Sequence, residues 1–275
     1  KSRVKIIDPI LSFLKTKKGI ALIVAIVLGS WFWRCLPSPL FSEPTSTVLE
    51  DHSGTLLSAR IAADGQWRFP ITKHVPQKFI ESIIQFEDKQ FYKHPGVNPF
   101  SIGRATVQNL KAQKVKSGGS TLSMQVIRLM RKKKKRTFLE KMIEIILALR
   151  LELSYSKSEI LALYASYAPF GGNVIGIDAA SWRYYGRDPE KLSWAEAATL
   201  AVLPNAPSLI YPGKNQLLLR AKRDRLLNQL CAAHLIDKTT CELSKKENLP
   251  DKPHIIPQLA PHLLQRAITE GWEGK

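Results

Sequence analysis

The stretch from Pro76 to Gly96 decides the fold, and it reads PQKFIESIIQFEDKQFYKHPG. Pro76 suits the first position of a helix. Apolar residues then recur at helical spacing on one stripe, which ends at a carboxylate: Phe79, Ile80, Ile83 and Glu87. A carboxylate held against apolar packing is partly desolvated, which raises its pKa and suits proton transfer near neutral pH. On spacing alone, the favoured interpretation is that Glu87 simply caps a surface helix, because most such carboxylates are structural.

The residues around Glu87 change this balance. Residues 87–99 read EDKQFYKHPGVNP, and residues 118–125 read GGSTLSMQ. Three further segments follow: EKMIE at 140–144, SKSEILALY at 156–164 and APFGG at 168–172. Together they resemble the five motifs, in order, of the peptidoglycan glycosyltransferases (family 51). This lysozyme-like family polymerises lipid II, and the sequence is most similar to its penicillin-binding protein 1C branch. The resemblance covers roughly Val48 to Pro212.

The resemblance implies a mainly α fold: a lysozyme-like glycosyltransferase domain with a small N-terminal β-hairpin. By the same match, Glu87 would be the catalytic base that deprotonates the acceptor hydroxyl, and Glu144 the family's second glutamate. The residues expected to contact substrate are Asp88, His94, Arg104, Gly119, Ser120, Thr121, Gln125, Arg128 and Lys141. Asp88 is expected to orient its neighbours rather than to react.

Glu144 is expected to be half buried, with Leu147, Ala148 and Leu151 on its next turn. A carboxylate so placed can position a divalent cation, Mg²⁺ or Mn²⁺, or a cationic side chain near a leaving pyrophosphate. No metal ligand is certain, with Glu144 the one candidate, and the cation is expected to stimulate activity without binding tightly. The alternative for Glu144 is an ion pair with a nearby lysine such as Lys141.

The segment Gly118–Thr121 opens a predicted helix, whose backbone N–H groups would suit an anion. Without the resemblance it would be an ordinary capped helix start. Arg128 stands where the family commonly has lysine, so the charge is kept while its geometry changes. Two other departures are Glu140 in place of an arginine and Ser166 in place of an asparagine. They predict weaker activity or dependence on another cation. Variation at position 140 is also a feature of the penicillin-binding protein 1C branch.

The composition is strongly basic, with 41 Lys plus Arg against 23 Asp plus Glu and a net charge of +18 over 275 residues. Such a charge predicts a polyanionic partner, which nucleic acid, an anionic bilayer or a lipid pyrophosphate would satisfy. The run Arg131–Arg136 is the most basic segment: a solvated loop, a contact with anionic lipid headgroups, or both.

An apolar run at residues 19–36 points to a membrane partner, because it follows Lys15, Lys17 and Lys18 and ends near Trp31 and Trp33. We expect a single-pass anchor in the bacterial inner membrane, with a cytoplasmic N-terminus and a periplasmic or extracellular catalytic domain. The run is borderline in length, and a cleaved signal peptide is the competing interpretation. Outside the cytoplasm, nucleic acid is not expected as a partner. The expected partners are lipid II, the growing glycan strand and the membrane, with unidentified cell-wall synthesis proteins.

The expected organisation follows from these segments: residues 1–18 a basic tail, 19–36 the anchor, 37–47 a linker, 48–215 the glycosyltransferase domain and 216–275 a helical extension. A β-hairpin is predicted over residues 48–58 and a short strand within 66–72. Helices follow, among them an apolar core helix over 137–155, capping boxes at Ser156 and Ser193, and a helix over 217–235. Cys231 and Cys241 could form a disulfide or remain free thiols.

Three functions are consistent with the sequence. The leading prediction is a membrane-anchored transferase that forms β-1,4 glycan strands from lipid II with inversion and releases undecaprenyl pyrophosphate. A lysozyme-like hydrolase or lytic transglycosylase would also use two carboxylates, but it needs neither an anchor nor a pyrophosphate site. The third is a catalytically weak scaffold that binds cell-wall precursors, which Glu140 and Ser166 favour.

Overall fold

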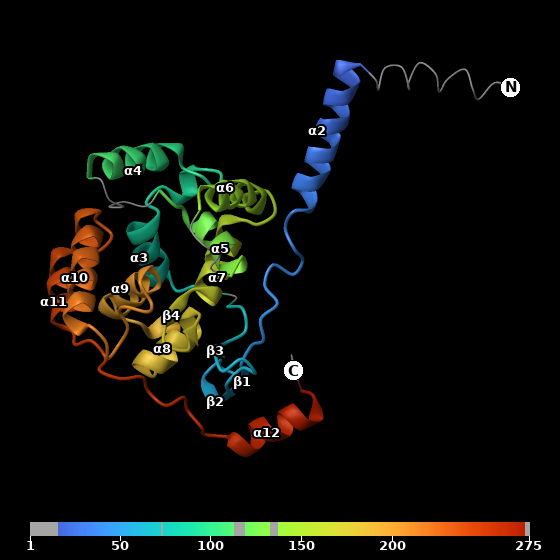
Figure 1. Ribbon diagram of the computed structural model, residues 1–275. Coiled ribbons are helices and arrows are strands. Elements are labelled where there is room, and N and C mark those ends of the chain that lie inside the picture. Colours follow the sequence, from blue (N-terminus) through green and yellow to red (C-terminus); the bar gives the residue numbers. More distant parts are fainter. Residues whose placement is uncertain (1–15, 73, 113–118, 133–136, 273–275) are drawn as a thin grey trace. The chain divides into compact units, whose positions relative to one another are not determined.

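The computed structural model describes residues 16–72, 74–112, 119–132 and 137–272. The described residues up to Ser42 form one compact unit, and those from Glu43 onward form a second (Figure 1). The first unit contains helix α2, Lys17–Arg34, which is capped by the Thr16 side chain. The second unit contains all the other described helices and strands.

Among the described residues, no helix is long and apolar enough to cross a membrane. The predicted transmembrane helix at residues 19–36 is therefore not confirmed. The reason lies in α2 itself, because charged Lys17, Lys18 and Arg34 occupy its two ends. The uncharged stretch between them is 15 residues, or ~22 Å at ~1.5 Å per residue, against a hydrocarbon core of ~30 Å.

Two small sheets lie in the second unit. The predicted hairpin is confirmed: β1, Thr47–Glu50, pairs antiparallel with β2, Leu56–Arg60, and Thr47 lies opposite Arg60. The predicted short strand is β3, Trp67–Arg68, which runs parallel to β5, Val174–Ile175. Strand β4, Pro169–Gly171, pairs antiparallel with β5. Neither β4 nor β5 is predicted, because two or three residues are too few to show alternation.

The helices up to residue 167 contain most of the segments that resemble the family motifs. They are α3 (Gln77–Glu87), the 3₁₀ helix η1 (Phe91–Lys93), α4 (Pro99–Ala112), α5 (Leu122–Met130), α6 (Phe138–Glu152) and α7 (Lys157–Tyr167). Helix α3 presents the predicted stripe to the core, where Phe79 and Ile83 are fully buried. Helix α5 packs against α6 and α7.

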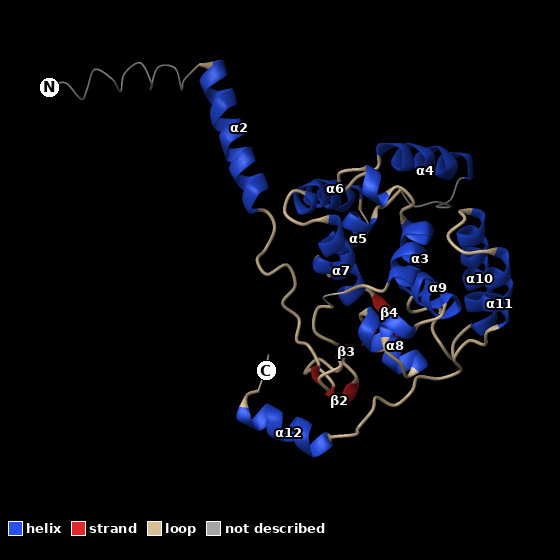
Figure 2. Cartoon of the chain, turned by 180° about the vertical axis from the view of Figure 1, so that it is seen from behind, coloured by secondary structure: helices blue, strands red, loops and turns tan. Residues whose placement is uncertain are grey.

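The remaining helices are α8 (Ile177–Tyr185), η2 (Pro189–Lys191), α9 (Trp194–Val202), η3 (Leu203–Asn205), α10 (Gln216–Ala232), α11 (Lys238–Lys246) and α12 (Pro261–Glu270). Helix α9 is alanine-rich and buried along its length, and it packs against both α3 and α10. Helices α10 and α11 lie side by side (Figure 1 and Figure 2). Both predicted capping boxes are present, Ser156 with Glu159 and Ser193 with Glu196. A mainly helical fold is thus confirmed.

The prediction that the helix at 137–155 runs through the core is wrong. In α6 only Glu144, Leu147, Ala148 and Leu151 are buried, whereas Phe138 and Leu139 are exposed. Its apolar residues surround the helix, but α5 packs against one side only, and composition does not specify which side is covered.

One departure from the family pattern, Ser166, has a structural role, and the predicted alternatives for the two cysteines are resolved. Ser166 is buried, and its Oγ accepts a hydrogen bond from the backbone N–H of Thr72 at 3.1 Å. Cys231 and Cys241 are both free thiols. The fold therefore uses Ser166 to hold the segment that precedes α3, and it does not cross-link α10 to α11.

Candidate active site

A cleft of about 1480 Å³ opens between α3, α4, α5, α6 and the turn after α9. Ten of the residues singled out in the sequence line it: Glu87, Asp88, Arg104, Gly119, Ser120, Thr121, Gln125, Arg128, Lys141 and Glu144. They come from four separate segments, so the fold gathers the expected site around one cavity. His94 is the exception, because it does not line the cleft.

Glu87 lies at the C-terminal end of α3, where the apolar stripe meets the cleft. Its Oε2 accepts a hydrogen bond of 2.8 Å from the Gln125 amide. Its Oε1 is buried and has no hydrogen-bond partner among the described residues. Burial raises the pKa of Glu87 above its ordinary value, while the side chains of Gln125 and Asn205 and the charge of Lys222 oppose this rise. Such a carboxylate is suited to accept a proton.

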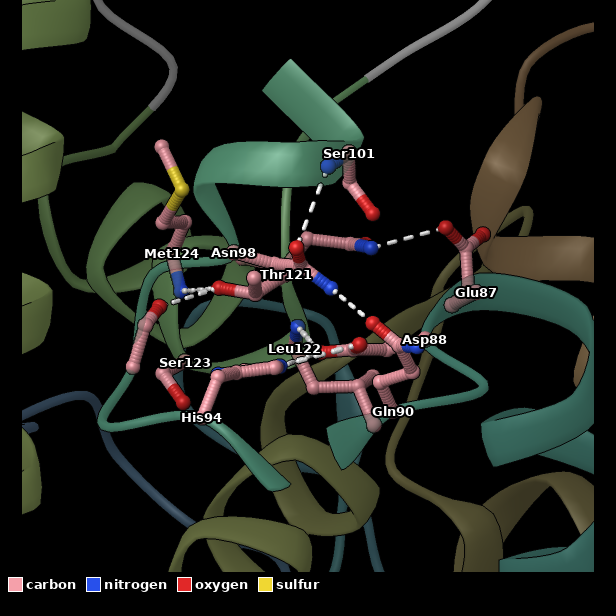
Figure 3. A network of polar contacts seen from close by, with 12 residues as sticks. Glu87, Asp88, Gln90, His94, Asn98, Ser101, Thr121, Leu122, Ser123 and Met124 are labelled. Atoms are coloured by element: carbon pink, nitrogen blue, oxygen red, sulfur yellow. Dashed lines mark hydrogen bonds and ion pairs between the residues drawn. The ribbon is translucent and has the colours of Figure 1, made fainter. Parts of the chain in front are cut away.

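Asp88 follows Glu87 in the chain but points the other way (Figure 3). It is buried, and His94 Nε2 lies 3.0 Å from each of its carboxylate oxygens. Asp88 Oδ2 also accepts the backbone N–H of Leu122 at 3.1 Å. His94 therefore lies behind the cleft wall and binds Asp88. Asp88 joins the loop after α3 to the start of α5, which is a positioning role.

The start of α5 is less open to an anion than the sequence suggests. Thr121 is its N-cap residue, and its Oγ1 accepts the Met124 N–H. The carboxylate of Asp88 occupies the Leu122 N–H. An anion would thus meet the side chain of Ser120 and the cations nearby rather than these two backbone groups, which are already satisfied.

Two glycines allow the segments to approach closely. A Cβ on Gly96, whose φ is +88°, would lie 2.7 Å from the Ala148 carbonyl oxygen of α6. A Cβ on Gly119 would lie 2.8 Å from Ile102 Cα on α4. Side chains at either position would push apart the elements that surround the cleft.

Glu144 is buried and paired with two cations. Arg128 binds both of its carboxylate oxygens, at 2.8 and 2.9 Å, and Lys141 Nζ lies 3.3 Å from Oε2. Lys141 also donates to Ser120 Oγ at 2.6 Å. The alternative of an ion pair with Lys141 is therefore confirmed, with Arg128 as the stronger partner. These contacts hold two positive side chains at the cleft wall.

The contacts of Glu144 do not fit a metal held by the chain. Both of its oxygens are engaged by Arg128. Within the described ranges, no group of three or more His, Cys, Asp or Glu side chains could hold a metal ion.

Comparison with known proteins identifies the family of the chain. The sequence pattern of a family described as Transglycosylase matches residues 54–231. The chain belongs to this transglycosylase family. It is 42% identical over 258 residues to penicillin-binding protein 1C of Escherichia coli. The aligned region covers 90% of this chain and 33% of that protein. It is 36% identical over 198 residues to penicillin-binding protein 1A of Pseudomonas aeruginosa, covering 71% and 24%.

The chain thus spans about a third of the first of these two relatives and about a quarter of the second. A solved structure, the 2.6 Å crystal structure of penicillin-binding protein 1A from Haemophilus influenzae, covers 86% of this chain and 25% of that chain. The identity is 17% and the TM-score is 0.43.

Glu140, the departure expected to weaken the transglycosylase cleft, is paired. Arg131 Nε and Nη2 donate to its two oxygens at 2.5 and 3.0 Å. Glu140 therefore both introduces a negative charge and neutralises Arg131 beside the cleft. Lys132 Nζ lies 3.4 Å from Glu43 Oε1. The rest of the basic run, residues 133–136, lies outside the described residues.

Sequence reasoning did not predict three residues that interact with Glu87: Tyr164 and Asn205, which line the cleft, and Lys222 on α10. Tyr164 lines the cleft with a buried hydroxyl that has no hydrogen-bond partner in the described chain. Burial, and then the nearby charge of Glu87, raise the pKa of Tyr164. Tyr164 lies within a quoted motif and could have been named. Asn205 also lines the cleft, and Lys222 binds it from α10. No sequence pattern links these two residues to Glu87, more than 110 positions earlier.

Proposed function

We propose that this chain is a peptidoglycan glycosyltransferase that polymerises lipid II into β-1,4-linked glycan strands and releases undecaprenyl pyrophosphate. The observation that carries the proposal is the Glu87 carboxylate. It is half-buried at the cleft wall with a raised pKa, and one of its oxygens has no hydrogen-bond partner among the described residues. Such an oxygen is suited to accept the proton of a sugar hydroxyl.

The reaction follows from this placement. Glu87 takes the proton from the acceptor hydroxyl as its oxygen attacks the anomeric carbon of the donor. The new glycosidic bond forms while the bond from that carbon to the pyrophosphate oxygen breaks. Attack opposite to the leaving group inverts the anomeric centre. The leaving group departs with the electron pair as undecaprenyl pyrophosphate.

The leaving group needs positive charge, and the cleft supplies it. Arg104, Arg128 and Lys141 all line the cavity. The bidentate pair with Glu144 fixes Arg128, so that its guanidinium is pre-organised, and Lys141 is held between Glu144 and Ser120. Fixed cations stabilise developing charge without reorganisation. Any Mg²⁺ or Mn²⁺ that stimulates turnover would be held mainly by the pyrophosphate, as is usual for Mg²⁺ bound to phosphates.

The lytic alternative has less support. Glycoside cleavage normally uses a second carboxylic acid that faces the scissile bond. In this cleft both oxygens of Glu144 are bound to Arg128, and Lys141 binds one of them as well. Both oxygens of Glu144 are therefore already engaged by cationic hydrogen-bond donors, and the described part of the cleft offers no second free carboxyl group at this position.

The test is polymerisation of labelled lipid II in detergent with Mg²⁺, comparing the wild type, Glu87→Gln and Glu81→Gln. We expect polymer from the wild type and from Glu81→Gln, whose side chain does not line the cleft. Glu87→Gln should lose at least ~100-fold in kcat while still binding lipid II, because only the base is removed. Turnover by Glu87→Gln at the wild-type rate would refute the assignment. Binding without turnover by the wild type would instead favour a scaffold.

We also propose that the chain works at the bacterial inner membrane, because its substrate is a lipid. Helix α2 exposes large apolar side chains around its surface, among them Ile23, Ile26, Val27, Trp31 and Trp33. Exposed apolar area of this kind marks a contact with another apolar phase or partner. Cell-wall synthesis proteins are further candidate partners.

A further inference from the structure

The turn after α9, which lines the cleft, makes a polar contact with α10 that has no role in the proposed reaction. Asn205 ends η3 and lines the cleft, and Lys222 lies on α10. Lys222 Nζ donates a hydrogen bond of 3.1 Å to Asn205 Oδ1. Helix α10 also packs against α3, where the Gln85 side chain donates to the Gln229 carbonyl at 3.1 Å. The contact is therefore fixed relative to the helix that ends at Glu87.

The chemistry of this contact orients the Asn205 amide. An ammonium group has donors only, so it selects the amide oxygen of Asn205 as the atom that faces it. The Nδ2 group is then left for the cleft. In agreement with this orientation, the Asn205 side chain acts to lower the pKa of Glu87.

The groups that surround Glu87 come from five elements. Asp88 follows it in the chain and raises its pKa, and Tyr164 approaches from α7. Gln125 on α5, Asn205 on η3 and Lys222 on α10 all lower the pKa of Glu87. Lys222 is the cation of this set. Its own pKa is lowered by partial burial, and Arg225 lowers it further while Glu87 raises it.

We infer that Lys222, through Asn205, positions the Glu87 carboxylate and keeps it in the ionised form that accepts the proton of the acceptor hydroxyl. Gln125 fixes Oε2. Lys222 and Asn205 supply positive charge on the other side, and Oε1 has no hydrogen-bond partner among the described residues. This role rests on the proposed function of Glu87 as the base. Lys222 does not contact the reacting atoms, and it is a positioning residue.

The test is the pH dependence of kcat/KM for lipid II polymerisation. Loss of the Lys222 charge should raise the pKa of Glu87 further, so the acidic limb of the profile should move to higher pH in Lys222→Met. We expect a shift of about 0.5 to 1 pH unit, with kcat lowered about 3- to 10-fold on the acidic limb and KM changed less than about 2-fold. Lys222→Arg should restore the limb towards the wild-type pH, because it keeps the charge.

Two further variants complete the design. Arg220→Met removes a positive charge from an exposed position on the same helix and should leave the limb in place. Asn205→Ala changes an exposed residue, so the fold should tolerate it, and it should move the limb in the same direction as Lys222→Met. The double variant should move the limb no further than the larger single shift, because the two residues act through one contact.

The outcomes separate this inference from the proposed function. An inactive wild type, or an active Glu87→Gln, would refute the role of Glu87 and with it the positioning role. If Glu87→Gln is inactive but the acidic limb stays at the wild-type pH in Lys222→Met and in Asn205→Ala, only the positioning role is refuted. A uniform loss of kcat at every pH in Lys222→Met would also refute it, because that result indicates a purely structural contact.

Discussion

Glu87 and Asp88 show how two adjacent carboxylates acquire different roles from their surroundings. Glu87 ends the apolar stripe of α3, where burial raises its pKa, and one oxygen has no hydrogen-bond partner in the described chain. Asp88 binds His94 and the Leu122 N–H, so its oxygens are occupied. The first is suited to proton transfer, while the second holds the loop against α5. The spacing of the stripe predicts the burial of Glu87, whereas the contacts of Asp88 depend on the tertiary fold.

Asp178 predicts a second effect at the residue scale, on stability rather than on activity. Burial first, and then the charges of Glu50 and Asp188, raise its pKa from 3.8 to about 7. The native state therefore binds this proton more tightly than the unfolded state. The contribution of Asp178 to stability is greatest below the pKa that this residue has in the unfolded state, and it falls as the pH rises from about 4 to about 7.

In Asp178→Asn this decrease in stability with rising pH should be absent. We expect the free energy of unfolding at about pH 8 to exceed that of the wild type by about 2 to 4 kcal/mol, with a much smaller difference near pH 4. Urea unfolding at the two pH values measures it. Asp251→Asn, at an exposed position, serves as the control. Equal pH dependence in Asp178→Asn and the wild type would show that Asp178 is ionised in the native state.

At the scale of elements, the sequence predicts what is encoded locally. Both capping boxes follow from neighbouring residues alone. The pairing of β3 with β5 joins residues 107 positions apart, which no local pattern encodes. The exposed side of α6 was missed for a related reason, because apolar composition does not show which neighbours are present. The pair of Arg131 with Glu140 likewise needs two segments to meet.

The buried side chain of Arg223 holds helix α11 against helix α10. Its side chain is fully buried on α10. It donates to the Glu247 and Lys245 carbonyl oxygens at 2.7 and 2.9 Å, and it pairs with Asp224 at 2.9 Å. These bonds satisfy carbonyls at the C-terminal end of α11 and join α11 to α10.

Arg223→Met should therefore destabilise the protein strongly. The buried carbonyls lose their donors, and the expected loss in the free energy of unfolding is about 3 kcal/mol. Arg225→Met, at an exposed position on the same helix, should change it by less than about 0.5 kcal/mol. Thermal or urea unfolding of the two variants decides between them. A similar small change in both would mean that α11 is held by its apolar contacts alone.

At the scale of the whole molecule, the segment beyond the family match returns to the start of the second unit. The match ends at residue 231. Beyond it, the Leu259 N–H donates to the Leu57 carbonyl at 2.8 Å, and the Gln258 amide donates to the Ala59 carbonyl at 3.0 Å. The hairpin that opens this unit is thus held by the segment that closes it, and the unit from Glu43 onward contains every residue that lines the cleft.

Removal of residues 1–42 should consequently separate catalysis from membrane attachment. The shortened chain retains the whole cleft, so we expect its kcat on lipid II in detergent to stay within about 2-fold of the full chain. Without the exposed apolar residues of α2, it should lose most of its flotation with vesicles of anionic lipid. Turnover on lipid II in vesicles should fall accordingly. Undiminished flotation would instead assign attachment to the surface of the second unit, where Phe100 and Phe138 are exposed.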